Sequence, residues 1–497
     1  MNVGHSSDVQ RREKSELIRA FVRGGFLSPA ALLKIMELSK SLGNKHVLFG
    51  SRQDIMFPWN HASQEQLAAV FNAIKIEHEL SGDISVHQNI VTSYVAVNVV
   101  ETTSWVKEDT YNVLMDAFEF TPRLKINIVD PMQRIVPLFS GQLNFIAARE
   151  ENYWYLYIRD PRKGNVLECW PRLVFGQDIP KISKELESLF LEFRPFTTEE
   201  LYLMLLNNYV RITYKPISEK LKLQDNAFPI YEGLNAMLNN QYWLGLYWRN
   251  NEYDIEFMSA ACKLCQETNI SKINIIPWKA FIIKGIKAAD RVRWEKVMGK
   301  FGINERHSSL ELNWHLPLLD MEALELKRFL VRELDQQDIS THGLTFTVKT
   351  HREMVYFTNI VIEKNTSIQT PGEHYDILYA RNFNPATLTY TPYARGVMKE
   401  MIPTLLIELS KQYFRQLNPE KEVSEVAPAP AVIANSNDHT HPHVYQCVNC
   451  LTVYDEQVGD ALAGVKAGTK FEELPKTYVC HVCGAGVGEF VLARLSH

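Results

Sequence analysis

Four cysteines near the C-terminal end constrain the fold of this chain more than any other feature. They form two Cys-x-x-Cys pairs, Cys447 with Cys450 and Cys480 with Cys483. Each pair can close a tight turn around one edge of a tetrahedron, so the four thiolates suit one iron or one zinc ion. Two disulfides are the alternative. Only 7 cysteines occur in 497 residues, which is too few for a disulfide scaffold, and paired motifs in a reducing compartment favour a metal.

Composition places the rest of the chain among globular proteins. Hydrophobic residues make up 46% and aromatic residues 11%, enough to fill several cores. The 53 basic and 58 acidic residues form no long run of one sign, so we expect neither nucleic acid nor a membrane surface as a partner. No apolar stretch reaches the roughly 20 residues of a membrane span, and the first residues are polar. The sequence therefore predicts a cytoplasmic protein.

Residues 416–442 differ from the sequence on either side of them. Pro, Ala, Ser, Asn and charged residues replace the apolar periodicity there, which is typical of a flexible linker. His439, His441 and His443 alternate at its end, but no carboxylate or cysteine accompanies them closely. We interpret them as part of the linker rather than as a metal site. The linker would tether a small domain over residues 443–497.

The region before the linker shows an internal repeat. Helical periodicity at residues 27–43 precedes two strand-like segments within 46–59 and a second helical segment at 64–75. The same order of helix, strand, strand and helix recurs within residues 255–303. We therefore predict an α+β fold with two related halves. The predicted segments are a polar tail over 1–19, a first half over 20–235 and a second half over 236–415.

Further segments are rich in β-branched and aromatic residues or show a long helical period. Strands are predicted within residues 90–100, 124–130, 153–160, 344–350 and 355–363. A last helix is predicted over residues 396–417.

The residues between the two cysteine pairs favour iron over zinc. Over residues 443–497 the sequence resembles the rubredoxin family, whereas a zinc ribbon would share only the cysteines. The matching positions, besides the cysteines, are Tyr445, Tyr454, Asp455, Gly459, Asp460, Gly464, Gly468, Thr469, Phe471, Leu474, Pro475, Gly484 and Phe490. The resemblance implies one iron ion per chain that carries single electrons. It implies Cys447, Cys450, Cys480 and Cys483 as the iron ligands.

Three positions depart from the rubredoxin pattern. Tyr478 stands where the family usually has Trp, His481 where it usually has Pro, and Val487 where Lys is common. Tyrosine still supplies an aromatic wall beside the metal. A histidine next to the sulfurs adds an ionisable group, which affects the reduction potential more than the fold.

The N-terminal region resembles the nitrite and sulfite reductase haemoprotein family. The resemblance lies in "GGFLSPAALLKIMELSKSLGNKHVLFGSRQDIMFP", which contains Arg52 and Gln53, and in "FTPRLKINIVD", where Arg123 and Lys125 match a basic pair of the family. It implies a duplicated α+β fold over residues 20–415. It also implies that Arg52, Arg123 and Lys125 form a cradle for an oxyanion or for haem propionates. Ordinary surface charges are the alternative.

One part of that family's pattern is absent. The family uses four cysteines of the second half to hold a [4Fe–4S] cluster that bridges to sirohaem, whereas "GINERHSSLELNWHLPLLDMEAL" contains no cysteine. Cys262 and Cys265 lie on the preceding predicted helix without a second pair, so we interpret them as helix cysteines of the core or surface. We expect no [4Fe–4S] cluster, and sirohaem has no support beyond the resemblance.

Three functions are compatible with this sequence. The favoured one is an electron carrier whose large region docks redox partners, a reductase and an acceptor, in nitrite or sulfite assimilation. A reductase-like enzyme that retains a haem-type cofactor is the second, and a scaffold with structural zinc is the third. Whether the chain is an enzyme stays open, and an electron carrier is preferred to a complete reductase. A mild negative bias of the small domain, to which Asp460 contributes, would steer it toward a basic face that includes Arg52, Arg123 and Lys125.

Overall fold

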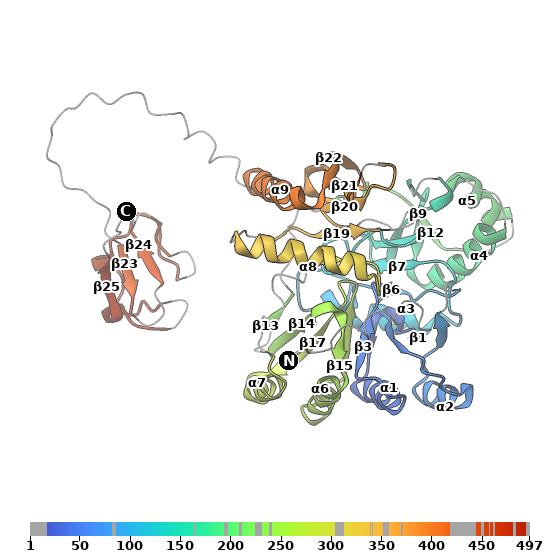
Figure 1. Cartoon of the computed structure of the whole chain (residues 1–497), viewed down its shortest axis with the longest axis horizontal. Helices are drawn as coiled ribbons and strands as arrows, with labels where there is room; N and C mark the ends of the chain where they lie inside the picture. The colour runs from blue at the N-terminus through green and yellow to red at the C-terminus, as the bar shows by residue number, and fades with distance from the viewer. Residues whose placement is uncertain are drawn as a thin grey trace. The chain divides into compact units, whose positions relative to one another are not determined.

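The chain forms two compact units, Met1–Lys421 and Glu422–His497, which are called here the large unit and the small unit. A computed structural model of the chain provides the coordinates (Figure 1). The structure describes residues 17–81, 86–163, 166–192, 197–207, 211–223, 231–237, 241–303, 313–337, 339, 341–350, 357–368, 371–417, 444–448, 452–456, 458–460, 463–480 and 484–493.

Two antiparallel sheets of the large unit have matching strand orders. The first has the order β15–β3–β4–β1–β5 and the second β2–β16–β17–β14–β13. The strands of the first are β15 (Tyr253–Asp254), β3 (His46–Phe49), β4 (Ile55–Pro58), β1 (Leu17–Ala20) and β5 (His78–Ser81). Those of the second are β2 (Phe26–Leu27), β16 (Ile273–Ile276), β17 (Ala280–Lys287), β14 (Gln241–Leu246) and β13 (Gly233–Ala236). The two orders show the duplication that the sequence predicts.

The two sheets exchange their edge strands. Strand β15, from the second half of the sequence, pairs with β3 of the first half, and β2, from the first half, pairs with β16 of the second. Asn251, just before β15, extends the first exchange, since its side chain accepts from the Phe49 N–H at 2.9 Å and donates to the Phe49 carbonyl at 2.8 Å. Each half therefore completes the sheet of the other.

Four helices stand in a row against these sheets (Figure 1). They are α1 (Pro29–Ser41), α2 (Gln64–Ile74), α6 (Ile255–Glu267) and α7 (Arg291–Lys300). Short polar side chains start three of them, because Ser28 Oγ accepts from the Ala31 N–H, Ser63 Oγ from the Gln66 N–H and Asp254 Oδ1 from the Phe257 N–H. These bounds and those of β3, β4, β16 and β17 confirm both copies of the predicted helix, strand, strand, helix repeat.

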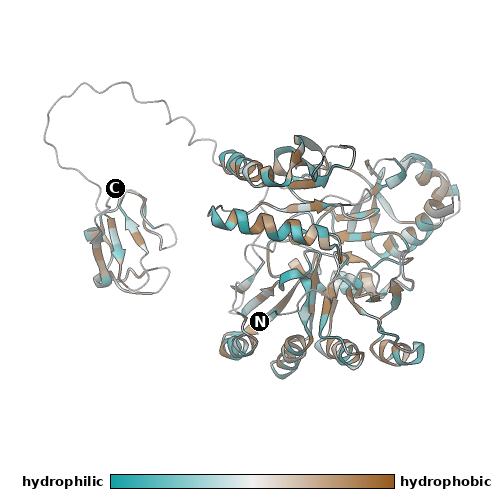
Figure 2. Cartoon of the chain, viewed as in Figure 1, coloured by the Kyte–Doolittle hydropathy of each residue, from teal (hydrophilic) through white to brown (hydrophobic). Residues whose placement is uncertain are grey.

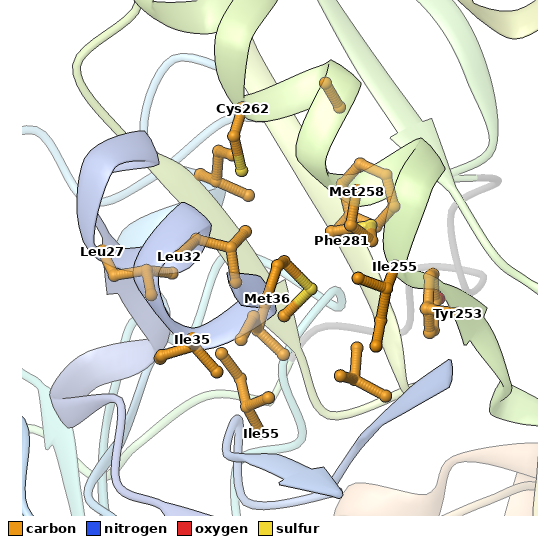
Figure 3. Close-up of a cluster of buried hydrophobic side chains, with 14 of the residues drawn as sticks. Leu27, Leu32, Ile35, Met36, Ile55, Tyr253, Ile255, Met258, Cys262 and Phe281 are labelled. Atoms are coloured by element: carbon orange, nitrogen blue, oxygen red, sulfur yellow. The ribbon is translucent and has the colours of Figure 1, made fainter. Parts of the chain in front are cut away.

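The largest core of the described residues lies between these helices and the sheets. Helices α1 and α6 meet there. Figure 3 shows Leu32 and Met36 of α1 in one cluster with Met258 and Cys262 of α6. Figure 2 shows that hydrophobic and hydrophilic positions alternate along the helices. Burial of one helix face therefore joins the two halves.

Two mixed sheets complete the large unit, one in each half. Each begins with three parallel strands and continues with antiparallel ones. The first contains β6 (Val91–Thr92), β7 (Ile126–Val129), β8 (Leu143–Ala147), β9 (Tyr153–Arg159), β11 (Arg172–Phe175) and β12 (Tyr214–Pro216), with β10 (Leu167–Cys169) paired to β9. The second contains β18 (Trp314–His315), β19 (Phe346–Lys349), β20 (Ile360–Lys364), β21 (His374–Ala380) and β22 (Tyr390–Met398).

Each mixed sheet shares a hydrophobic core with its own helices. The first packs with α3 (Glu108–Asp116), α4 (Ile179–Glu192) and α5 (Thr198–Asn207), and the second with α8 (Met321–Gln336) and α9 (Ile402–Leu417). None of the described helices has both the length and the hydropathy that a bilayer crossing requires.

Two predicted elements differ from the structure. Residues 90–100 contain only the short strand β6 and then a single 3-10 turn, because the chain turns back after Thr92. The helix predicted over 396–417 starts at Ile402, since the preceding residues up to Met398 extend β22. Apolar residues of a strand end continue without interruption into those of the helix, so periodicity alone misses this boundary.

Candidate metal centre

Cys447 and Cys480 occupy equivalent turns of the small unit. Cys447 ends β23 (Val444–Cys447), which pairs with β24 (Val453–Asp455) and β25 (Phe490–Ala493). Its N–H donates to the Thr452 carbonyl at 2.8 Å, five residues on, and the Cys480 N–H donates to the Ala485 carbonyl at 2.7 Å, also five residues on. The same backbone bond therefore closes both cysteine turns.

The second turn depends on a glycine. Gly484 has φ +76° and donates its N–H to the Cys480 carbonyl at 2.8 Å. A residue with a Cβ is strained in this left-handed conformation, so glycine is the suitable residue after the second cysteine pair. An antiparallel bridge between Val479 and Gly486 flanks this turn.

Both cysteines lie inside one hydrophobic cluster. Cys447 is 0% exposed and Cys480 is 1% exposed, and both belong to the core of the small unit. Cys450, Cys483 and His481 lie outside the described residues, so the complete set of four ligands stays a prediction. Two thiols at equivalent turns in a water-poor cluster fit half of the predicted tetrathiolate site.

Aromatic rings form most of this cluster. Tyr445 stacks on Phe471 with ring centroids 3.9 Å apart, and Phe471 contacts both Tyr454 and Phe490 at 5.7 and 5.6 Å. Tyr478 completes the group at 5.9 Å from Tyr454 and 6.0 Å from Phe490. Four of these rings are positions that match the rubredoxin pattern, and Tyr478 stands where that pattern has Trp. Such packing excludes water from the thiols.

The tyrosine in place of Trp makes a polar contact inside the core. The Tyr478 hydroxyl donates to Asp460 Oδ2 at 2.9 Å, and Asp460 Oδ1 accepts from the Ala463 N–H at 3.1 Å. Burial and this hydrogen bond raise the pKa of Tyr478. Asp460 is only 7% exposed, so it belongs to the interior of the small unit. The prediction that it is one of the surface charges that steer docking is wrong.

Two exposed valines flank the buried cysteines. Val448 follows Cys447 and is 51% exposed, and Val479 precedes Cys480 and is 49% exposed. Neither valine is assigned a role by the sequence patterns above. Alternation along the extended chain is the sequence signal, because neighbours of an inward-pointing residue point to the opposite side.

The two other paired cysteines belong to the core of the large unit. Cys262 and Cys265 on α6 are both fully buried among apolar side chains. Burial raises the pKa of Cys262 well above its ordinary value and that of Cys265 to about 12. Both therefore stay protonated near neutral pH and act as packing residues. Of the two predicted placements, core or surface of the helix, the structure shows the core.

Arg52 of the predicted anion cradle is enclosed by protein oxygens. Its guanidinium donates to Asn127 Oδ1 at 2.6 Å and to the carbonyls of Asn89 at 2.8 Å and Ile126 at 2.7 Å. Burial lowers the pKa of Arg52 to about 9. These bonds tie the turn after β3 to β7. They turn Nη1 and Nη2 of Arg52 toward protein oxygens, whereas its Nε makes no hydrogen bond with the described residues.

The other two cradle residues lie near the start of β7. The Arg123 side chain is exposed and Lys125 is half-buried, whereas Arg52 is 7% exposed. Glu187 Oε2 accepts from the Arg123 N–H at 2.5 Å and thereby fixes the backbone before β7. A shared role of these three cations toward an anion stays a prediction.

Comparisons with known proteins match each unit separately. The family model described as Rubredoxin matches residues 444–490. The Rubredoxin-2 of Desulfovibrio desulfuricans is 56% identical over 45 residues, which are 9% of this chain and 73% of that protein. The High molecular weight rubredoxin of Moorella thermoacetica is 46% identical over 46 residues, which are 9% of this chain and 20% of that protein.

The large unit resembles a solved structure. The Mycobacterium tuberculosis NirA protein superposes with a TM-score of 0.60, and the alignment covers 80% of this chain and 81% of that chain. The identity is 13%, so this likeness concerns the fold. It confirms the reductase-like α+β fold that the sequence resemblance implied for the large unit.

Proposed function

Because the chain belongs to the rubredoxin family through its C-terminal domain, we propose that it transfers single electrons through one iron ion held by four thiolates. The ligands are Cys447, Cys450, Cys480 and Cys483. The observation that carries the proposal is the pair of equivalent turns that bury Cys447 and Cys480 in one aromatic cluster. An iron ion in such a site changes its charge by one unit with little change of geometry.

The residues around the two cysteines suit this role. The aromatic cluster keeps water from the sulfurs, and backbone N–H groups of tight turns near thiolates raise the reduction potential of a bound iron. Val448 and Val479, the sequence neighbours of the two buried cysteines, expose apolar surface. A redox partner that packs against these valines would approach the site without having to remove water from charged side chains.

The large unit would select the redox partners. Its fold is that of a reductase-like protein, and it makes up most of the chain. Nitrite or sulfite assimilation is the setting that this fold favours, and the partners would be a reductase that donates electrons and a protein that accepts them. The segment between the units, with its linker-like composition, would let the small unit visit both.

Metal analysis and visible absorbance test the iron site. The chain is produced with iron and zinc both available, alongside Cys447→Ser, Cys480→Ser and the matched control Cys169→Ser, which changes an exposed cysteine of the large unit. We expect one iron per chain and a ferric-thiolate spectrum, both kept in the control and lost in the two ligand variants. One zinc per chain would favour the structural-zinc scaffold, and unchanged metal in both ligand variants would refute the site.

A haem-type cofactor in the large unit is the second candidate, and the shared fold with NirA is the observation that favours it. Strong Soret absorption in addition to the iron-thiolate bands would support this candidate. Absence of Soret absorption would support the electron carrier without a haem-type cofactor. Acid-labile sulfide would contradict the expectation that no [4Fe–4S] cluster is present.

A further inference from the structure

The large unit contains a cavity of about 410 Å³ that no part of the proposed function uses. Both halves contribute to it: the loop after β7, the turn between β16 and β17, the starts of β19 and β20, the loop after β21 and the end of α9. Its principal side chains are Arg134, Phe139, Trp278, Phe357, Phe383 and Tyr413. The volume is within the range of pockets that hold small organic molecules.

Hydrogen bonds among the lining residues hold the cavity in shape. Thr345 Oγ1 donates to Asn359 Oδ1 at 2.7 Å, and the Asn359 N–H donates to Thr345 Oγ1 at 2.9 Å. On the opposite half, Gln133 Oε1 accepts from the Val136 N–H at 2.8 Å, and its amide donates to the Val136 carbonyl at 3.0 Å. These polar groups already bind one another, so the cavity does not depend on a ligand for its form.

The Tyr413 hydroxyl is a buried polar group of the lining outside this set of bonds. The Tyr413 hydroxyl makes no hydrogen bond with any described residue, although Tyr413 is only 6% exposed. Gly343 leaves room for it, because a Cβ at this glycine would lie 2.3 Å from the hydroxyl oxygen. A buried hydroxyl without a partner costs free energy, which a ligand acceptor would recover. Burial raises the pKa of Tyr413, so the hydroxyl stays a donor at neutral pH.

The charge of the lining defines the ligand further. Arg134 is the single cationic side chain among the described residues that line the cavity, and none of those residues is acidic. Most of the remaining wall is aromatic or aliphatic. Arg52, Arg123 and Lys125 do not line it, and one arginine does not balance a tetrapyrrole with several carboxylates.

We propose that this cavity is a binding site for a small aromatic molecule that carries one acidic group. Trp278, Phe357 and Phe383 would pack against the rings, Arg134 would pair with the acid, and the Tyr413 hydroxyl would donate to a polar atom of the ligand. The site is separate from the iron centre of the small unit. An experiment can therefore refute ligand binding in the cavity without refuting electron transfer by the iron centre, and the reverse.

A pair of probes that differ by one acid tests the proposal on the full iron-containing chain. The probes are 8-anilinonaphthalene-1-sulfonate and its neutral relative N-phenyl-1-naphthylamine. Isothermal titration calorimetry avoids the absorption of probe fluorescence by an iron-thiolate centre. We expect the sulfonate to bind once per chain, and Arg134→Gln to weaken it by roughly tenfold through loss of a charge-assisted hydrogen bond. The neutral probe should change by less than about twofold, since uncharged contacts remain.

Two further variants locate the binding. Ala386→Phe fills part of the cavity and should weaken both probes, provided that its thermal unfolding matches that of the parent chain. Arg332→Gln removes an exposed arginine of α8 outside the lining and should change neither. The proposal is wrong if the sulfonate fails to bind, or if it binds equally to the parent chain, Arg134→Gln and Ala386→Phe.

Discussion

Tyr478 and Asp460 form a buried polar pair within the aromatic cluster of the small unit. Tyr478→Phe keeps the ring but leaves the Asp460 carboxylate without this donor. We expect the variant to lose about 1 to 2 kcal/mol of stability, since a buried acceptor that loses its partner costs that much. Faster loss of the iron-thiolate absorbance on heating would report it. Tyr445→Phe, which keeps its stack on Phe471, is the control and should change less.

A buried histidine of the large unit should make stability depend on pH. Burial lowers the pKa of His315 well below its ordinary value, and the neighbouring Lys279 lowers it further. The unfolded chain takes up a proton on His315 as the pH falls through about 6.5, whereas the folded chain does so only at lower pH. The unfolded state therefore binds more protons in this window, and the free energy of unfolding falls as the pH falls below about 6.5.

His315→Leu should remove that contribution. We expect the parent chain to lose roughly 1 to 2 kcal/mol more than the variant between pH 6.5 and 5, because a fully differing proton is worth about 1.4 kcal/mol per pH unit. Urea titrations at pH 7, 6 and 5, followed by tryptophan fluorescence, measure the difference. His61→Asn changes an exposed histidine whose φ of +59° suits Asn, and it should keep the parent slope. Equal slopes in all three chains would disprove this role.

At the level of single residues, the sequence shows which residues belong to a motif but not where their side chains point. The Arg52–Gln53 pair is a recognisable motif, and Tyr478 a recognisable departure. Nothing in the letters shows that Arg52 turns inward to Asn127 or that Asp460 turns inward to Tyr478. Those directions depend on side chains brought together only by the folded chain.

Gln53 connects three elements from separate sheets. Its side chain accepts from the Thr92 N–H at 2.9 Å and donates to the carbonyls of Thr92 at 3.1 Å and Ile275 at 2.9 Å. The turn after β3, strand β6 and strand β16 are joined in this way. Gln53 is 1% exposed, so water cannot replace these bonds.

Gln53→Ala should therefore destabilise the junction of these elements. We expect a loss of about 3 kcal/mol or more in the free energy of unfolding, because three buried backbone groups lose their partners. Gln53→Glu keeps the shape but places a carboxylate against two carbonyl oxygens, and it should cost at least as much. Gln66→Ala on the exposed side of α2 is the control. A loss below about 1 kcal/mol in the first variant, measured by urea unfolding, would exclude this junction role.

Elements with a local signal were predictable and those without one were not. The amphipathic helices α1 and α6 carry their own periodicity and caps, so the repeat can be recognised from the residues alone. Strands β2 and β15 have two residues each, too few to show a period, and their partners lie in the other half of the sequence. The exchange between the halves could not be predicted for that reason.

At the scale of the molecule, the two compact units should respond differently to loss of the metal. A small domain whose core surrounds its metal site depends on that metal for folding. We expect Cys447→Ser to lower or abolish the small-unit transition in calorimetry and to leave the melting temperature of the large unit unchanged. Cys169→Ser should keep both transitions. A shift of the large-unit transition in Cys447→Ser would show that the units depend on one another for stability.

The two candidate sites, the cysteines of the small unit and the cavity of the large unit, differ in how far the sequence predicts them. The spacing of the cysteines points to a metal site, because ligand chemistry favours paired cysteines, and the burial of Cys447 and Cys480 agrees with it. The ligand role of all four cysteines stays a prediction. The cavity next to Tyr413 could not be predicted, since its walls come from both halves and from loops without a motif. A sequence reveals sites that need particular residue types. It does not reveal sites formed when ordinary residues from distant segments enclose a cavity.

The exchanged edge strands also determine the order in which the sheets can be completed during translation. A ribosome completes β3 and β4 early, but the edge of β3 has no partner until Tyr253 and Asp254 have been synthesised. At common elongation rates that interval lasts roughly 10 to 40 seconds. An open strand edge is a template for pairing with another nascent chain. Yield of the intact protein should therefore depend on translation speed and on chaperone supply during this interval, even when the finished protein is stable.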